Sequence, residues 1–315
     1  MTLKATTQEQ VKAKASSKKR KNKLVFWLFL TPVLFSFIMV VVIPLILGIY
    51  YSFTNWDGIN EATFIGLANY INIFTEDTRF LHAILVTCGY TILNIIAVNV
   101  VSFSLALLVT RDLKFQNFYR VGFFLPNLIG GLILGYVWQF IYKTVIPGVG
   151  VTFGLESLIS TNMLGDANLA LIALVITGTW QYAGYIMMIY VTALQNVPKD
   201  LIEAAQIDGA NAWQRMKNIT LPLVASAFTI TLFLTLVNSF KQFDVNVSLT
   251  NGGPSTLFMG SAINGTELLA LNIYNEAFVS RQMAVGQAKA IVFFCALLIV
   301  SLVQVYINKK KEVEM

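Results

Sequence analysis

The chain has 315 residues, of which 56% are hydrophobic and only 12% are charged, and its mean hydropathy is +0.68. Soluble domains carry about 25% charged residues, so this composition excludes an ordinary soluble domain and places the chain in a membrane. The net charge of +6 does not indicate a nucleic-acid-binding protein, because eight of the 22 basic residues lie in one polar N-terminal tail, residues 1–23, which suits contact with anionic lipid.

Six apolar runs are each long enough to form a transmembrane helix, which needs about 20 such residues. They cover residues 24–50, 83–110, 121–142, 168–194, 221–240 and 290–308, and none contains Asp, Glu, Lys, Arg or His. The first run is too long for a signal peptide and lacks a small-residue cleavage site, so it is expected to remain as a helix. The sequence therefore predicts an all-α integral membrane protein with one six-span domain over residues 24–308.

The orientation of these spans follows from the basic residues, since Lys and Arg close to a span stay on the cytoplasmic side. With the N-terminus inside, the tail, the connections 111–120 and 195–220 and the C-terminal segment 309–315 lie inside and hold 17 of the 22 basic residues. Both termini are therefore predicted to be cytoplasmic.

The connection 195–220 is the one sizeable internal loop and is predicted to be helical. Asp200 followed by Glu203 suggests a capping box, and Gly209 suits the left-handed residue that ends a helix. A second short helix is predicted over 212–219, with Pro222 in the first turn of the fifth span. Side chains that would share one face of the first helix, at spacings of three and four, are Leu201, Ala204, Ala205 and Asp208.

The chain shows no energy source of its own. It has no Gly-Lys dipeptide and so no GxxxxGK[ST] phosphate loop. An ion-coupled secondary transporter, the less favoured alternative, would hold ionisable groups within its spans, which cost about 2.5 to 3.5 kcal/mol each at the bilayer centre. A membrane enzyme would need converging reactive groups at membrane depth, which are also missing. We therefore predict no enzymatic activity, no catalytic residue, no metal site and no cofactor bound by this chain.

Neutral polar side chains within or beside the spans are the candidate binding residues: Asn94, Asn99, Gln139, Gln181, Asn238 and Gln242. Each could instead join helices by a hydrogen bond worth about 0.6 kcal/mol. Near the fourth and fifth spans they occur together with Trp180, Tyr182, Tyr185 and Ser239. Uncharged donors and acceptors beside aromatic rings suit a sugar, whose hydroxyls need hydrogen bonds and whose apolar face packs on rings.

The loop also carries a recognisable motif: Glu203-Ala204-Ala205, then Gly209, then Ile219-x-Leu221-Pro222. It resembles the cytoplasmic EAA loop of permease subunits of binding-protein-dependent ABC importers. Further segments are similar to the sugar-transporting, maltose-type permeases of the carbohydrate uptake family: 118–120, 124–126, 137–138, 194–198, 243–244, 249–254 and 272–278. Two departures from that family are Met216, where Phe is common, and about ten residues, 255–264, that read as an insertion.

The resemblance implies a type I ABC importer permease in a bacterial plasma (inner) membrane that imports a carbohydrate, such as an oligosaccharide; the alternative is a non-sugar solute such as glycerol phosphate. It implies a second homologous permease, two cytoplasmic ATPase subunits that bind ATP and Mg, and an extracytoplasmic sugar-binding protein as partners. By position, Glu203, Ala204, Ala205, Asp208 and Gly209 are the expected ATPase-coupling residues. The expected substrate contacts are Tyr185, Asn238, Ser239 and Gln242.

Overall fold

The computed structural model describes residue 23 and residues 25–111 and 114–309, so the predictions for the N-terminal tail before residue 23 and for the last basic residues lie outside the described part. Its α-helices are α2 (Ile43–Ser52), α3 (Ala68–Thr75), α4 (Thr78–Val109), α5 (Gln116–Phe124), α6 (Gly131–Phe140), α7 (Ile146–Phe153), α8 (Glu156–Ser160), α9 (Ala167–Gln195), α10 (Lys199–Ile207), α11 (Ala212–Arg215), α12 (Leu221–Leu223), α13 (Ala225–Phe240), α14 (Asp244–Leu249), α15 (Leu269–Tyr274) and α16 (Met283–Lys309). Tighter or wider helical turns are η1 (Ile38–Val42), η2 (Leu125–Leu128), η3 (Ile141–Val145), η4 (Met216–Thr220) and η5 (Asn275–Val279), and the strands are β1 (Ser255–Phe258) and β2 (Ser261–Asn264).

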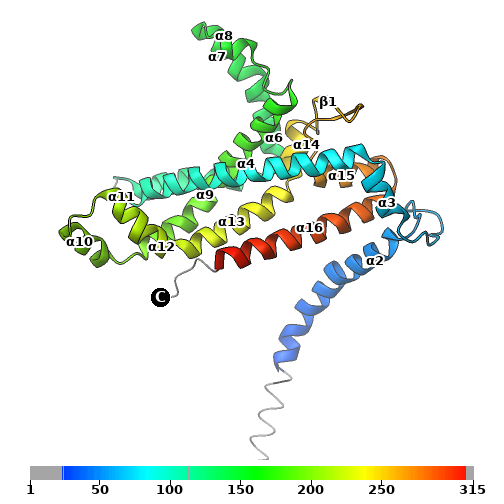
Figure 1. Cartoon of the computed structure of the whole chain (residues 1–315), viewed down its shortest axis with the longest axis horizontal. Coiled ribbons are helices and arrows are strands. Elements are labelled where there is room, and N and C mark those ends of the chain that lie inside the picture. Colours follow the sequence, from blue (N-terminus) through cyan, green and yellow to red (C-terminus); the bar gives the residue numbers. More distant parts are fainter. Residues whose placement is uncertain (1–22, 24, 112–113, 310–315) are drawn as a thin grey trace, which may run out of the picture.

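Four long helices, α4, α9, α13 and α16, run alongside one another and form the body of the molecule (Figure 1). Helices α10, α11 and α12 lie at one end of this body, and α3, α15 and the β-hairpin lie at the other. Small buried residues such as Ala106, Ala183 and Ala227 let the helices approach closely, around a core that includes Tyr190. The α10–α12 segment and the β-hairpin therefore lie at opposite ends of the body.

Two parts of the chain pack against this body at one end and then extend away from it: α2 packs on α16, and α6 packs on α14. The first span, Val25–Ser52, has almost no buried residues, and it diverges from the other helices (Figure 1). Helices α6, α7 and α8 form a second arm that extends in another direction. Both arms expose large apolar side chains, including Phe29, Phe35, Phe140 and Phe153.

The predicted spans agree with the helices, with corrections to the bounds of the third, fifth and last spans. Among the described residues, five helices are long and apolar enough to cross a membrane, Val25–Ser52, Thr78–Val109, Gly131–Phe153, Ala167–Gln195 and Met283–Asn308, and a sixth candidate is the pair Ala212–Leu223 and Ala225–Phe240, which is bent by 69°. The predicted third span, 121–142, is wrong in its bounds because η2 and the extended residue Ile129 interrupt it. The fifth helix begins at Ala225 rather than at residue 221, because Pro222 belongs to the separate turn of α12.

Proline explains several of the irregular turns. The π-helical turns η1, η3 and η4 each end just before a helix with proline in its first two positions, namely Pro44, Pro147 and Pro222. Proline has no N–H to donate, and its ring clashes with the carbonyl four residues earlier. A wider π turn accommodates this defect without ending the helix.

The last span contains a charge that the sequence places outside it. Helix α16 begins at Met283, earlier than the predicted residue 290, and so includes Lys289, which is fully buried. Its Nζ lies 2.6 Å from Asp77 Oδ2 and 2.6 Å from Glu276 Oε2, and donates to Asn272 Oδ1 at 3.2 Å. Asp77 also caps α4 by accepting from the backbone N–H of Phe80. One ammonium group thus joins α16 to α4, α15 and η5.

Residues 255–264, which read as an insertion in the sequence, form an antiparallel β-hairpin of β1 and β2. Ser255 pairs with Asn264, and the turn residues Met259 and Gly260 both have positive φ, 49° and 79°, as a type I′ turn requires. The Phe258 ring lies 5.1 Å from the ring of His82 on α4. The hairpin is therefore anchored at the end of the body opposite α10.

Candidate functional site

The loop with the EAA motif forms a projecting helix–turn–helix. Helix α10 starts after Pro198 and ends in a Schellman motif, in which the Ala210 N–H donates to Ala205 O (2.8 Å) and the Gly209 N–H donates to Gln206 O (3.1 Å). This motif needs a residue in the left-handed region, and Gly209 has φ +81°. The predicted helix and its terminating glycine are both confirmed.

The predicted capping box is wrong in its position. Helix α10 has no side-chain cap, whereas Asn211 and Gln214 form a capping box at the start of α11. Arg215 strengthens the same turn by donating from Nη1 to Ala210 O at 2.6 Å. From Ala212 the chain is helical through η4 to α12, so the predicted second helix is confirmed and extends beyond residue 219. Hydrogen bonds therefore close the turn between the two helices.

The surface of this helix pair is available to a partner. Glu203, Ala204 and Asp208 are exposed, and Ala205 is half-buried. The apolar side chains of Ile207 and Trp213 are 87% and 70% exposed. Small and apolar groups exposed beside carboxylates form a surface that a second protein could cover.

A polar cavity of about 170 Å³ lies between α4, α9 and α13. Its walls carry hydroxyl, amide and one ammonium group and no carboxylate. The lining residues are Tyr90, Asn94, Gly178, Gln181, Tyr182, Thr235, Asn238, Lys241 and Gln242. Such a set offers hydrogen bonds to a neutral, hydroxyl-rich molecule.

The structure brings two of the four expected substrate contacts into this cavity. Asn238 and Gln242 line it, and Gln242 interacts with the hydroxyl of Tyr90. Ser239 is buried behind the wall, where it donates to Thr235 O at 2.6 Å and accepts from Asn94 Nδ2 at 2.8 Å. Tyr185 lies outside the cavity, packed edge-on against Tyr182 with ring centroids 5.7 Å apart, and lines a separate apolar hollow.

Sequence reasoning did not single out the wall that α4 supplies. Tyr90 and Asn94 are four residues apart and therefore share a face of α4. The available signal was the polar residue Asn94 within an apolar span, but it did not distinguish a cavity wall from a helix–helix contact. Asn99, one turn further along α4, makes a helix–helix contact. Its Nδ2 donates to Thr235 Oγ1 (3.0 Å), and its Oδ1 accepts from Tyr190 Oη (2.7 Å). The Tyr190 hydroxyl in turn accepts from Thr231 Oγ1 (2.6 Å).

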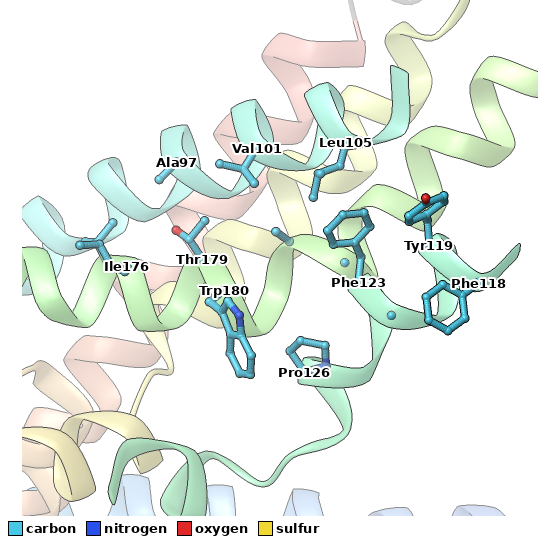
Figure 2. Close-up of a pocket in the computed structure, with 14 residues that line it drawn as sticks. Ala97, Val101, Leu105, Phe118, Tyr119, Phe123, Pro126, Ile176, Thr179 and Trp180 are labelled. Atoms are coloured by element: carbon cyan, nitrogen blue, oxygen red, sulfur yellow. The ribbon is translucent and has the colours of Figure 1, made fainter. Parts of the chain in front are cut away.

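A larger cavity, of about 790 Å³, lies between α4, α5 and α9 (Figure 2). Figure 2 shows the rings of Phe118, Phe123 and Trp180 with Pro126 around it. Its walls are almost entirely apolar, so it cannot satisfy the hydroxyl groups of a sugar. The sequence groups Trp180 with the polar candidates, but its side chain lines this larger apolar cavity and not the polar cavity.

The chain matches the model of the family "Binding-protein-dependent transport system inner membrane component" over residues 13–313. It is 47% identical to the "Probable starch degradation products transport system permease protein AmyD" of Thermoanaerobacterium thermosulfurigenes, with 94% of this chain and 97% of the relative covered. It is 32% identical to the "Multiple sugar-binding transport system permease protein MsmF" of Streptococcus mutans, with 93% and 98% covered.

A solved structure of a bacterial ABC transporter that imports the acidic polysaccharide alginate has a chain of the same fold. The TM-score is 0.78 at 19% identity, and the match covers 93% of this chain and 98% of that one. The family match extends over nearly the whole chain, and the fold agrees with it. The chain therefore belongs to the family of inner membrane components of binding-protein-dependent transport systems.

Proposed function

We propose that this chain is the permease subunit of an ATP-driven importer of carbohydrates, most directly of oligosaccharides. The observation that carries this proposal is the polar cavity of about 170 Å³, whose walls present amide and hydroxyl groups and a single ammonium group inside an apolar helical body. A neutral polyol finds there the hydrogen bonds that it loses on leaving water. The relatives named for starch degradation products and for multiple sugars support the same class of solute.

The partners follow from the surfaces that the chain leaves open. We infer that a second, homologous permease packs against the first span and the α6–α8 arm, which expose apolar side chains over their length. Two cytoplasmic ATPase subunits would bind ATP and Mg, and one of them would contact α10 and α11 through Glu203, Ala204, Ala205, Asp208 and Gly209. An extracytoplasmic binding protein would deliver the sugar to the end that carries the hairpin.

ATP binding would then bias the permease between two conformations. An ATPase pair that closes on ATP would move the attached α10–α11 unit. The Schellman turn and the capping box would keep this unit rigid, so that its motion is passed on to the body helices. Coupling of this kind is a population shift driven by a partner's ligand.

Within the cavity, we propose that Asn238 and Gln242 contact the sugar directly. Ser239 would act through Asn94, to which it is hydrogen-bonded. Tyr185 would contact the sugar from the separate apolar hollow that it lines together with Arg120 and Met188, where the second permease would complete the pathway. These four roles are testable one residue at a time, because alanine at a sugar contact changes uptake affinity whereas alanine at a helix contact lowers stability.

Glycerol phosphate is the second candidate solute, favoured by Lys241. This residue lines the cavity, which has no carboxylate, and so could meet a phosphate. A relative from Brucella abortus at 28% identity is named for sn-glycerol-3-phosphate transport. Amide and hydroxyl groups outnumber this one cation in the cavity, and we therefore favour a neutral sugar.

Reconstitution distinguishes the two solutes. The complete importer, with its ATPases and binding protein, is placed in proteoliposomes and given labelled maltotriose or sn-glycerol 3-phosphate. We expect ATP-dependent accumulation of maltotriose, and no accumulation when ATP is replaced by ADP. Uptake of glycerol 3-phosphate with none of maltotriose would contradict the carbohydrate proposal.

The membrane orientation is tested by cysteine labelling in intact cells. We propose that both termini and the α10–α11 unit are cytoplasmic, as the basic residues indicate. In a variant that lacks Cys88 and Cys295, a membrane-impermeant maleimide is expected to label cysteines at Asn60 and Thr256 and to leave a cysteine at Asn211 unlabelled. Reaction at Asn211 in sealed cells would reverse the orientation and remove the site proposed for the ATPase.

A further inference from the structure

The larger apolar cavity is separate from the proposed sugar site. It has a volume of about 790 Å³ and shares no lining residue with the polar cavity. Ala97, Val101 and Leu105 line it from α4, and Ile176 and Trp180 line it from α9 (Figure 2). Both helices are candidate membrane spans, so the cavity lies at membrane depth. Its occupant is therefore a component of the membrane or part of another membrane protein.

The cavity exists because small residues leave space at its wall. A Cβ atom placed on Gly122 of α5 would have no other atom within 4 Å, and Ala97 faces the same space from α4. The cavity opens to the surface, since the lining residues Phe118 and Trp180 are 74% and 44% exposed. Protein interiors are packed without large voids, and apolar cavities do not hold water. An apolar group from the surroundings is thus needed to fill it.

Basic side chains lie beyond one end of this cavity. Leu105, which lines the cavity, is six residues before Arg111, or about 9 Å of helical rise, and Phe118 is four residues after Lys114. In the sequence, the connection 110–120 holds three basic residues and one acidic residue. Arg111 and Lys114 are exposed, and within the described residues neither forms an ion pair. This end of the cavity is therefore suited to a negatively charged group.

We propose that the larger apolar cavity binds an anionic phospholipid, with one acyl chain between α4, α5 and α9 and the phosphate near Arg111 and Lys114. The volume of about 790 Å³ lies within the roughly 300–1,000 Å³ of sites that hold small molecules. In the proposed orientation this end of α4 faces the cytoplasm, and basic pockets between spans on that side bind anionic lipid headgroups. The inference concerns a different surface from the sugar site and goes beyond the proposed function.

A phospholipid fits this place better than a helix of the second permease does. A phospholipid carries its negative charge next to its apolar chain, so that one molecule matches both the cavity and the basic residues at its end. A protein helix would have to bring carboxylates to the level of Arg111 and Lys114. The apolar surfaces assigned above to the second permease are the first span and the α6–α8 arm. The lipid would contact all three helices and so hold α5 against α4 and α9.

Native mass spectrometry of the complete importer tests the proposal. The complex is purified in a mild detergent, stripped of lipid and given phosphatidylglycerol or phosphatidylcholine with identical acyl chains. We expect wild type to retain phosphatidylglycerol roughly 10- to 30-fold more tightly, as two basic residues near the phosphate predict. A phosphatidylglycerol with a photoreactive group in its acyl chain is expected to label peptides of α4, α5 and α9.

Two sets of variants with matched controls separate the acyl chain from the headgroup. Gly122→Phe places a ring in the cavity and should reduce photolabelling there at least tenfold, whereas Gly89→Phe, at a glycine of α4 that also has open space but does not line the cavity, should not. The double variant Arg111→Gln, Lys114→Gln should lose the preference for phosphatidylglycerol. Lys217→Gln, which removes an exposed lysine from η4, should keep it.

The outcomes that contradict the proposal are equally specific. Labelling of Gly122→Phe equal to wild type would overturn it, and so would a double variant with the wild-type lipid preference. If Gly122→Phe does not assemble, a photoreactive amino acid at position 118 decides: cross-linking to lipid supports the site, and cross-linking to the second permease shows that a protein fills the cavity. None of these measurements involves sugar uptake, so their failure leaves the proposed function untouched.

Discussion

Replacement of Lys289 by methionine is expected to destabilise the protein by about 3–5 kcal/mol, because removal of one partner from a buried ion pair leaves the other charge uncompensated. Here two carboxylates, Asp77 and Glu276, would lose the ammonium group that lies 2.6 Å from each. They would then repel each other at the junction of α4, η5 and α16. The measurement is the heat stability of the purified permease in detergent, with the complex yield as a second readout.

Two controls separate charge from packing. Lys143→Met also removes a lysine from a long apolar helix, but this side chain is exposed, so little change is expected. The triple variant Lys289→Met, Asp77→Asn, Glu276→Gln removes all three charges while asparagine still caps α4, and it should recover much of the loss. A Lys289→Met protein as stable as wild type would show that the cluster does not hold these helices together.

Replacement of Gly209 by proline is expected to abolish ATP-driven uptake while the permease remains in the membrane. Proline fixes φ near −65° and has no N–H, whereas Gly209 has φ +81° and donates to Gln206 O. The Schellman turn cannot form, and the α10–α11 unit loses its orientation toward the proposed ATPase surface. Binding-protein-stimulated ATP hydrolysis by the reconstituted complex is the direct measurement.

Gly209→Asn is the matched control, since asparagine tolerates the left-handed conformation and keeps the N–H. It should retain most of the stimulated ATP hydrolysis, and Glu203→Gln, which removes a charge without removing the side chain, tests the carboxylate separately. Normal stimulated hydrolysis by Gly209→Pro would contradict a coupling role for this turn.

The charge cluster around Lys289 also refines the argument about ion coupling. Lys289 lies inside a span, where ionisable groups are costly, but it is paired with two carboxylates and an amide at the end of the bundle. A fully paired cation of this kind serves as a structural joint between helices. The energy source therefore remains the partner ATPase in our proposal.

The sequence alone determined the features that depend on local patterns. Continuous apolar runs must be helical in a bilayer, because no water is present to satisfy the backbone, so the helical structure of these runs was predictable. The helix at Lys199–Ile207 and the turn at Gly209 were also predictable, since a glycine with a left-handed conformation ends a helix by interactions within a few residues.

Only the tertiary structure decided which polar residues meet. Asn94 and Ser239 are 145 residues apart in the chain and Lys289 and Asp77 are 212 apart, yet each pair is in contact. No periodicity within one helix shows which face a neighbouring helix covers, so Asn94, Asn99 and Ser239 look alike in the sequence. Packing of α4 against α9 and α13 gave Asn99 a full set of partners, placed Ser239 behind the wall and left the buried Asn94 oxygen without a donor.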